Sequence, residues 1–172
     1  MTATYDSIAT FTSNGAQNPI TFNNIPQTFS DLVLVIAGRA TGSAQEDTTL
    51  AYLNINTGTT NYSNTWVYNT ASSLVTNRAA NQVYFGFGNH PGGGATANIF
   101  GVEVFHFIDY TNANKFKTVL SESVADLNGS GSTYRTVNLW RQTAAINRID
   151  MYVSGPAWAS GSTLTLYGIK AA

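Results

Sequence analysis

The 172-residue sequence predicts an all-β protein, an antiparallel β-sandwich of about ten strands that occupies residues 1–172 as a single domain. Composition is the first observation behind this prediction. The 18 Asn, 23 Thr and 14 Ser make up almost a third of the chain, whereas Asp, Glu, Lys and Arg together make up only 10%. Charged residues normally cover the outer face of soluble helices, and here they are too few to cover many. Thr favours pleated, half-buried strands, while Asn, Ser and Gly favour turns, so we expect a low-charge surface rich in hydroxyl and amide groups.

The second observation is the succession of strand and turn signals in the first half of the chain. Ser13-Asn14-Gly15 is a turn signal, and the segment Asn23 to Pro26 interrupts the extended chain again. The strongest strand is apolar at successive positions, which is typical of a strand covered on both faces. The strands expected here are Tyr5–Thr12, Pro19–Phe22, Asp31–Ala37 (the strongest), Leu50–Ile55 and Tyr62–Tyr68.

The third observation is the alternation of apolar and polar residues in the second half. Val137 and Leu139 alternate with Thr136 and Asn138, as expected of a half-buried strand. Turn signals recur roughly every 8–12 residues, the spacing of a sandwich or a jelly roll, although this spacing does not fix which strands pair. The strands expected here are Gln82–Phe87, Ile99–Tyr110, Phe116–Val124, Tyr134–Trp140, Ile149–Val153 and Leu164–Ile169.

Two segments are predicted to depart from the sheets. The run Gly88 to Gly94 is rich in glycine, which is unfavourable in a helix or a central strand, so it is expected to be an exposed loop. The segment Ala71 to Ala80 is the best place for a single helical turn.

Charge and cysteine content restrict the partners and the folding compartment. The net charge is −1 and the pI is about 6.0, with no basic stripe or acidic tail, so we expect no nucleic-acid partner. No apolar run approaches the roughly 18 residues of a membrane span, and the first residues lack the pattern of a signal peptide. We therefore expect no membrane partner. The absence of cysteine excludes disulfides and thiol catalysis and fits folding in a reducing cytoplasm.

The motifs of enzymes are missing, so we expect no catalytic activity, no cofactor and no metal site. Phosphate-binding and nucleophile-elbow sequences are absent. His106 lies inside a predicted strand and His90 in the glycine run, so neither is expected to serve a serine triad, and two distant histidines cannot form a zinc site. Glu103 and Glu122 could act as a glycosidase pair only if they faced each other, whereas two glutamates on a sheet are more often solvated.

Several aromatic residues could stack on sugar rings, with Asn and Thr as hydrogen-bonding neighbours. They include Trp66, Tyr68, Trp140 and Trp158. The favoured interpretation is that they fill the sandwich core or a subunit interface, where their large apolar area stabilises most.

Two stretches of the sequence resemble one protein family. The N-terminal stretch reads Tyr5-Asp-Ser-Ile-Ala-Thr-Phe and then Ile20-Thr-Phe-Asn-Asn-Ile-Pro26-Gln-Thr-Phe-Ser-Asp31-Leu-Val-Leu-Val-Ile, and the C-terminal stretch reads Ser162-Thr-Leu-Thr-Leu-Tyr167-Gly168-Ile169-Lys170. Together they resemble small β-sandwich virion proteins of tailed bacteriophages, including cyanophages. In that family the segment Ile-Pro-Gln-Thr-Phe-Ser-Asp-Leu before a strand and the terminal Leu-Tyr-Gly-Ile recur. Between the two stretches the likeness is compositional only.

This resemblance implies a jelly-roll-like sandwich that forms a homo-oligomer, most often a trimer. Members of the family are capsid decoration (cement) proteins or parts of tail appendages, and no catalytic residue carries over. We therefore expect a virion structural protein that folds in the cytoplasm of the bacterial host and is located on the virion surface. It would bind the major capsid protein and stabilise the assembled shell, with Trp66, Tyr68, Asn89, His90, Gly92 and Gly93 at or near an interface. The alternative is a tail-fibre or appendage module that binds a host receptor or a carbohydrate.

Overall fold

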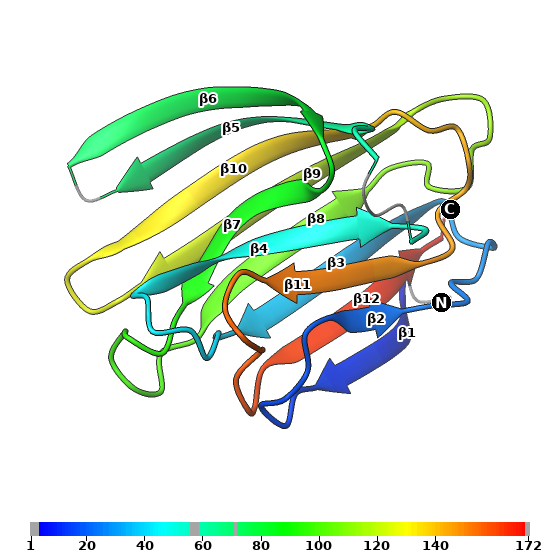
Figure 1. Ribbon diagram of the computed structural model, residues 1–172. Coiled ribbons are helices and arrows are strands. Elements are labelled where there is room, and N and C mark those ends of the chain that lie inside the picture. Colours follow the sequence, from blue (N-terminus) through cyan, green and yellow to red (C-terminus); the bar gives the residue numbers. More distant parts are fainter. Residues whose placement is uncertain (1–3, 56–58, 71, 171–172) are drawn as a thin grey trace.

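The computed structural model describes residues 4–55, 59–70 and 72–170. These residues form twelve β-strands in two antiparallel sheets that pack face to face (Figure 1). The predicted antiparallel sandwich is thereby confirmed, with twelve strands in place of about ten. None of the described residues belongs to a helix long and apolar enough to cross a membrane.

The larger sheet contains eight strands and the smaller sheet four. Their spatial orders are β1-β12-β3-β8-β9-β10-β5-β6 and β2-β11-β4-β7. The large sheet consists of β1 (Tyr5–Thr12), β12 (Thr163–Ile169), β3 (Asp31–Gly38), β8 (Gly101–Phe107), β9 (Lys117–Asp126), β10 (Gly131–Trp140), β5 (Tyr62–Thr70) and β6 (Ser73–Gln82). The small sheet consists of β2 (Ile20–Phe22), β11 (Ile149–Val153), β4 (Glu46–Leu53) and β7 (Phe85–Pro91).

Eight of the strands have the connectivity of a jelly roll. When β5, β6, β9 and β10 are set aside, the others, counted along the chain, lie in the orders 1-8-3-6 and 2-7-4-5. That is the order of an eight-stranded jelly roll, and we call these eight strands the jelly-roll frame. The hairpins β9–β10 and β5–β6 continue the large sheet beyond β8, and we call these four strands the extension. In Figure 1, β5 and β6 lie beyond the edge of the small sheet.

The interior of the frame is mainly apolar on both sheets. On β3, Leu34 points inward and is in register with Phe105 of β8, while Met151 of β11 points toward them from the small sheet. Burial of each such side chain contributes about 1.5–3 kcal/mol. The cluster draws residues from both sheets and from the connection that carries Trp158, so it fixes the sheets against each other.

The predicted helical turn is wrong. Residues Ser73–Gln82 form the edge strand β6, which pairs with β5 over most of its length; Ala71 lies outside the described residues. Tertiary pairing with β5 supplies the backbone hydrogen bonds that a helical turn would otherwise have made.

The predicted glycine-rich loop is wrong for most of its length. Gly88 to Pro91 belong to β7, and Gly92 is buried as well; Gly93 and Gly94 form an exposed turn. The reason is position: β7 is an edge strand, and an edge strand accommodates Gly and Pro because one side of its backbone needs no ladder partner.

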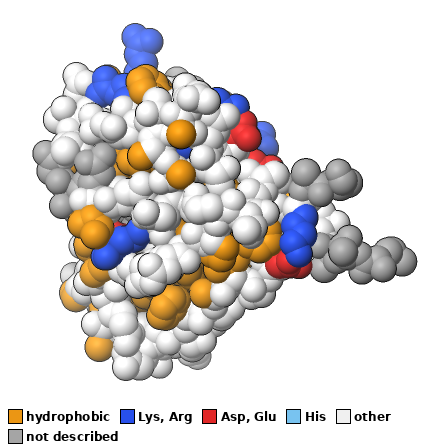
Figure 2. Space-filling view, turned by 90° about the vertical axis from the view of Figure 1, so that its right-hand side faces the viewer, with side chains coloured by type: hydrophobic (Ala, Val, Ile, Leu, Met, Phe, Trp, Pro, Cys, Tyr) orange, Lys and Arg blue, Asp and Glu red, His pale blue; other side chains and the backbone are white. Residues whose placement is uncertain are grey.

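The surface is poor in charge, as the composition indicates. Figure 2 shows the end of the sandwich that lies on the right in Figure 1, and most of it is white, which marks uncharged polar side chains and backbone. Lysine, arginine and acidic residues form only small spots, and hydrophobic side chains are scattered among the polar ones.

Candidate functional site

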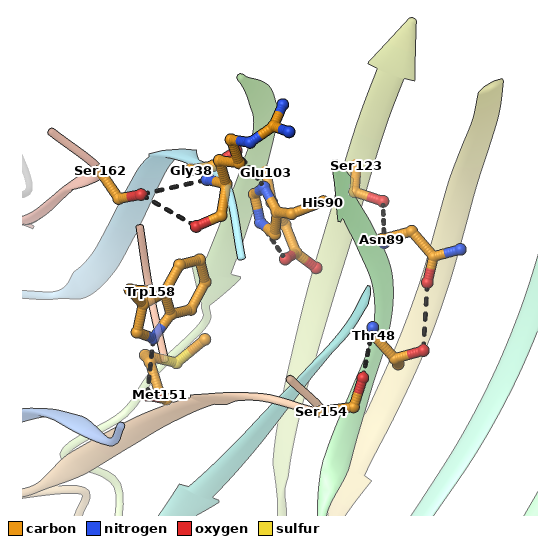
Figure 3. Close-up of polar contacts among 11 residues, drawn as sticks. Gly38, Thr48, Asn89, His90, Glu103, Ser123, Met151, Ser154, Trp158 and Ser162 are labelled. Atoms are coloured by element: carbon orange, nitrogen blue, oxygen red, sulfur yellow. Dashed lines mark hydrogen bonds and ion pairs between the residues drawn. The ribbon is translucent and has the colours of Figure 1, made fainter. Parts of the chain in front are cut away.

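A buried polar cluster lies between the sheets, where β7 packs on β8 and β9 (Figure 3). The ring of His90 lies between two acceptors: Nδ1 is 3.2 Å from the carbonyl oxygen of Gly38, and Nε2 is 3.2 Å from Oε2 of Glu103. The ring of Trp158 contacts the imidazole edge-on, with the ring centroids 5.2 Å apart. Gly88 makes room for this cluster, because a Cβ at that position would collide with Oε1 of Glu103.

His90 links two neighbouring strands. A carbonyl oxygen only accepts, so Nδ1 is the donor in the contact with Gly38, and Nε2 contacts the carboxyl group of Glu103. Both side chains are fully buried. Because neither group reaches solvent, we interpret the pair as a structural link that joins β7 to β3 and β8.

The two glutamates that could have formed a glycosidase pair lie on opposite faces of the large sheet. In the register of β8 with β9, Glu103 is opposite Ser123, and Val104 is opposite Glu122. Glu103 therefore points between the sheets and Glu122 points outward. This arrangement does not place two carboxylates around one sugar ring, as that mechanism requires.

Polar side chains also line the inner face of the extension beneath β7. Ser121, Ser123, Thr136 and Asn138 are all buried. Two of them bind the backbone of β7: the amide of Gly86 donates to Oδ1 of Asn138 at 3.1 Å, and the amide of Asn89 donates to Oγ of Ser123 at 3.1 Å. These bonds supply partners for backbone groups of an edge strand.

Around β9, the side of the large sheet that points away from the small sheet is apolar. Val102 of β8, Leu120 and Val124 of β9 and Val137 of β10 point away from the small sheet, and 42 to 49% of each residue is exposed. Val102 is directly opposite Val124, and Leu120 is directly opposite Val137, so these residues form a continuous surface.

An ion pair interrupts this apolar surface. Glu122 of β9 and Arg135 of β10 are opposite each other, with Oε1 and Nε 2.9 Å apart and the side chains 60% and 73% exposed. Grooves of about 370 and 390 Å³ lie on either side along the strands, and the ion pair borders both. We call this surface, with the ion pair and the apolar residues around it, the outer face.

The middle parts of strands β9 and β10 therefore have inverted polarity. A strand with one solvated face normally turns its apolar residues to the core and its polar residues to water. Here Ser121 and Asn138 are buried, whereas Leu120 and Val137 are exposed. A contiguous exposed apolar surface of this kind marks an interaction site more often than isolated apolar residues do.

The residues predicted for an interface lie in two groups. Trp66 and Tyr68 are half-buried on β5, and Asn89 is half-buried on β7. Tyr134 connects two of them: its ring stacks on Tyr68 with centroids 4.8 Å apart, and its hydroxyl accepts from Nδ2 of Asn89 at 3.3 Å. Burial, reinforced by the nearby Glu46 carboxylate and Tyr68, raises the pKa of Tyr134.

The second group of predicted interface residues is mostly buried and offers little surface for contact with another chain. His90 and Gly92 are buried within the chain, and Gly93 is exposed in the turn that follows β7. Of the possible sugar-stacking residues, Trp140 and Trp158 are buried in the core, which confirms the favoured interpretation for these two. The outer face was not predicted, because the alternation in β9 and β10 does not reveal which set of residues points outward.

A tyrosine cluster lies on the opposite side of the molecule, on the outward side of the small sheet. The ring of Tyr52 contacts Tyr152 and Tyr84 edge-on, with centroids 5.1 and 6.3 Å apart. Next to it, Arg148 donates to both carboxylate oxygens of Asp150 at 2.8 to 3.0 Å. Burial, together with the other two tyrosines, raises the pKa of Tyr52.

Comparison with known proteins gives no relative for this chain: no family model, no curated protein and no solved structure matches it. Within the described part of the chain, no group of three or more His, Cys, Asp or Glu side chains is placed to hold a metal ion.

Proposed function

We propose that this protein is a structural component of a bacteriophage virion, namely a capsid decoration protein that binds and stabilises the assembled shell. The observation that carries the proposal is the inverted polarity of β9 and β10, because exposed Leu120, Val124 and Val137 are explained by burial against another protein chain. The resemblance of the two terminal stretches to phage virion proteins supplies the context. The proposal assigns no catalytic residue, cofactor or metal to the chain.

The expected mechanism is mass action. A protein that binds only the assembled shell stabilises that shell in proportion to its binding free energy. The partners would be the major capsid protein and further copies of this chain, with a trimer as the order that the resemblance implies. The low charge limits nonspecific electrostatic adhesion, and the apolar outer face provides the binding energy.

Heat inactivation of particles assembled with and without this protein tests the proposal. Particles that contain the protein should survive to a higher temperature, and adding the purified protein to particles that lack it should restore the resistance. Leu120→Asp should abolish the restoration, because it places a charge in the apolar surface. Thr12→Asp, on exposed β1, is the matched control. Identical inactivation with and without the protein would contradict the proposal.

The second candidate is a tail appendage module that binds a host receptor or a carbohydrate. The tyrosine cluster of Tyr52, Tyr84 and Tyr152 beside the partly exposed Arg148 favours it, since aromatic rings next to hydrogen-bonding groups recognise sugars. A glycan array with the native protein and with Tyr152→Ala tests this candidate. Copy number separates the two: a number close to that of the major capsid protein indicates decoration, and a few copies per particle indicate a tail component.

A further inference from the structure

The outer face has a regular arrangement of charge and apolar groups. Glu122 and Arg135 occupy one cross-strand row of β9 and β10. The next outward row on one side pairs Leu120 with Val137, and the next on the other side pairs Val124 with Thr133. The surface thus carries one positive and one negative charge at its centre, with apolar and threonine side chains in the rows above and below. The row of Leu120 and Val137 continues to His106 on β8 and to Arg78 on the edge strand β6.

We propose that the outer face docks onto the outer face of a second copy of this chain, around a two-fold axis that runs along the strands between β9 and β10. The inference deepens the proposed function, on which it rests, by naming the partner of the apolar surface. It commits to self-association because the ion pair at the centre of the face is its own complement in charge.

The charges select this axis. Rotation about an axis along the strands places β9 of the second copy over β10, so that each Glu122 lies opposite the other copy's Arg135. Rotation about an axis across the strands would instead place Glu122 over Glu122 and Arg135 over Arg135, which is repulsive. Complementary charges across an interface favour one relative orientation of the two copies, and like charges disfavour the other. A two-fold contact of this kind is self-complementary and closes with two copies.

The size of the face suits such a contact. Six strands, from β3 to β6, at about 4.8 Å spacing and seven residues at about 3.3 Å per residue give a flat area of roughly 650 Å². Each partner in a stable interface contributes about 800 Å² of accessible surface. Protruding side chains raise the accessible area of the face above its flat area, toward this value. The grooves beside the ion pair give room for the side chains of a second sheet, as in sheet-on-sheet packing at about 10 Å.

This contact joins two copies, so a trimer would have to use a different surface. Trp66 and Tyr68 on β5 offer such a surface, because they are in register with Thr136 and Tyr134 and point toward the side of the small sheet, away from the outer face.

Charge reversal tests the inference. The three variants are Glu122→Arg, Arg135→Glu and the double swap of both. Both side chains are largely exposed, so each variant should fold, and thermal melting at low concentration checks this. Sedimentation of the native protein over a range of concentrations should give a dimer. Each single variant should dimerise at least about tenfold more weakly, because it places like charges opposite each other across the axis.

The decisive sample is an equimolar mixture of the two single variants. One carries two positive charges on its face and the other two negative charges, so the mixture should form a heterodimer, and the double swap should form a homodimer. An ion pair that acts only within one chain would not produce rescue by mixing. No rescue, or native-like dimerisation of both single variants, would overturn the inference.

A native protein that stays monomeric at every concentration would also overturn it. If that monomer still protects virus particles, the proposed function stands and the outer face belongs to the shell contact. A dimer that fails to bind or protect particles would instead contradict the proposed function and leave the self-association standing.

Discussion

The jelly-roll frame and the extension are both built from antiparallel strands, but they differ in the polarity of the side chains that point between the sheets. Along β3 of the frame, Leu34 and Ile36 are completely buried against the small sheet. Along the middle of β9 and β10 of the extension, the equivalent inward positions are held by Ser121, Thr136 and Asn138. Val119 and Trp140, on the same side, belong to the apolar core. The frame is stabilised mainly by the hydrophobic effect, whereas the inner side of the extension is stabilised by hydrogen bonds to β7.

This difference indicates that the extension gains further stability when its outward apolar residues are buried. Three of its apolar residues, Leu120, Val124 and Val137, point outward, where within one chain they meet solvent. Their burial requires another protein surface, so the frame specifies the fold and the extension is suited to assembly. The following predictions test this division, from the largest expected effect to the smallest.

Phe105→Ala should have the largest effect on stability. Phe105 is fully buried in the frame, so its truncation should lower the free energy of unfolding by about 3–5 kcal/mol. The matched control is Ser121→Ala on the neighbouring strand, because Ser121 is the register partner of Phe105 and points to the same side. That variant should lose about 1 kcal/mol, since it removes one hydrogen bond. Equal losses in urea unfolding would contradict the division.

The two glutamates of β8 and β9 should differ strongly. Glu103→Ala leaves His90 without its buried partner and should lower the free energy of unfolding by about 3–5 kcal/mol. Glu122→Ala breaks an exposed ion pair and should cost about 0–1 kcal/mol when measured at concentrations where the chain is monomeric. If urea unfolding gave the same cost for both, the His90–Glu103 pair would not link the sheets as described.

Alkaline pH should destabilise the fold through Tyr62. Burial raises the pKa of Tyr62 to about 12; the amide of Leu53, which donates to the hydroxyl, lowers it, and nearby Tyr52 and Asp150 raise it. A raised pKa means that the folded state holds the phenolic proton more tightly than the unfolded chain does. This contribution is complete below pH 10 and is lost between pH 10 and 12, at about 1.4 kcal/mol per pH unit.

Urea unfolding as a function of pH, compared with Tyr62→Phe, measures this loss. The variant should be less stable at neutral pH, because the amide of Leu53 loses its acceptor, and its stability should fall less steeply above pH 10. Parallel profiles for the two proteins would show that Tyr62 does not titrate as described.

Asn138→Ala should have an intermediate to small effect, confined to the contact between β7 and the extension. It leaves the amide of Gly86 without its acceptor and should cost about 1–3 kcal/mol. Hydrogen exchange at Gly86 should accelerate, while exchange at Leu34 in the frame should change only as much as global stability does. Asn69→Ala, at an exposed position on neighbouring β5, is the control. An unchanged exchange rate at Gly86 would contradict the role given to Asn138.

Much of the frame could be predicted from the sequence. The run at β3 and the alternation at β11 follow from residue periodicity, because periodicity reports burial directly. The spatial order of the jelly roll could not be predicted, since it depends on contacts between segments distant in the chain.

Three strands of the extension were predicted, but which of their faces points inward could not be predicted, for a different reason. In β9, Leu120 and Val124 alternate with Ser121 and Ser123, and the normal rule assigns the apolar set to the core. The structure has the opposite arrangement, because glycines of β7 bring its backbone within hydrogen-bonding distance of the serine and asparagine side chains. The burial of His90 has the same origin, since Gly88 makes room for Glu103 beneath it.

Burial of the outer face in the assembly is the central claim, and a cysteine reporter tests it most directly. The chain contains no cysteine, so Val137→Cys introduces a single thiol on the outer face, and Asn23→Cys places one at an exposed position after β2 as the control. Labelling with a maleimide should be slow for Val137→Cys in the concentrated, assembled protein and fast after dilution, whereas Asn23→Cys should react rapidly in both. Equal and rapid labelling of the two thiols in the assembled protein would contradict the claim.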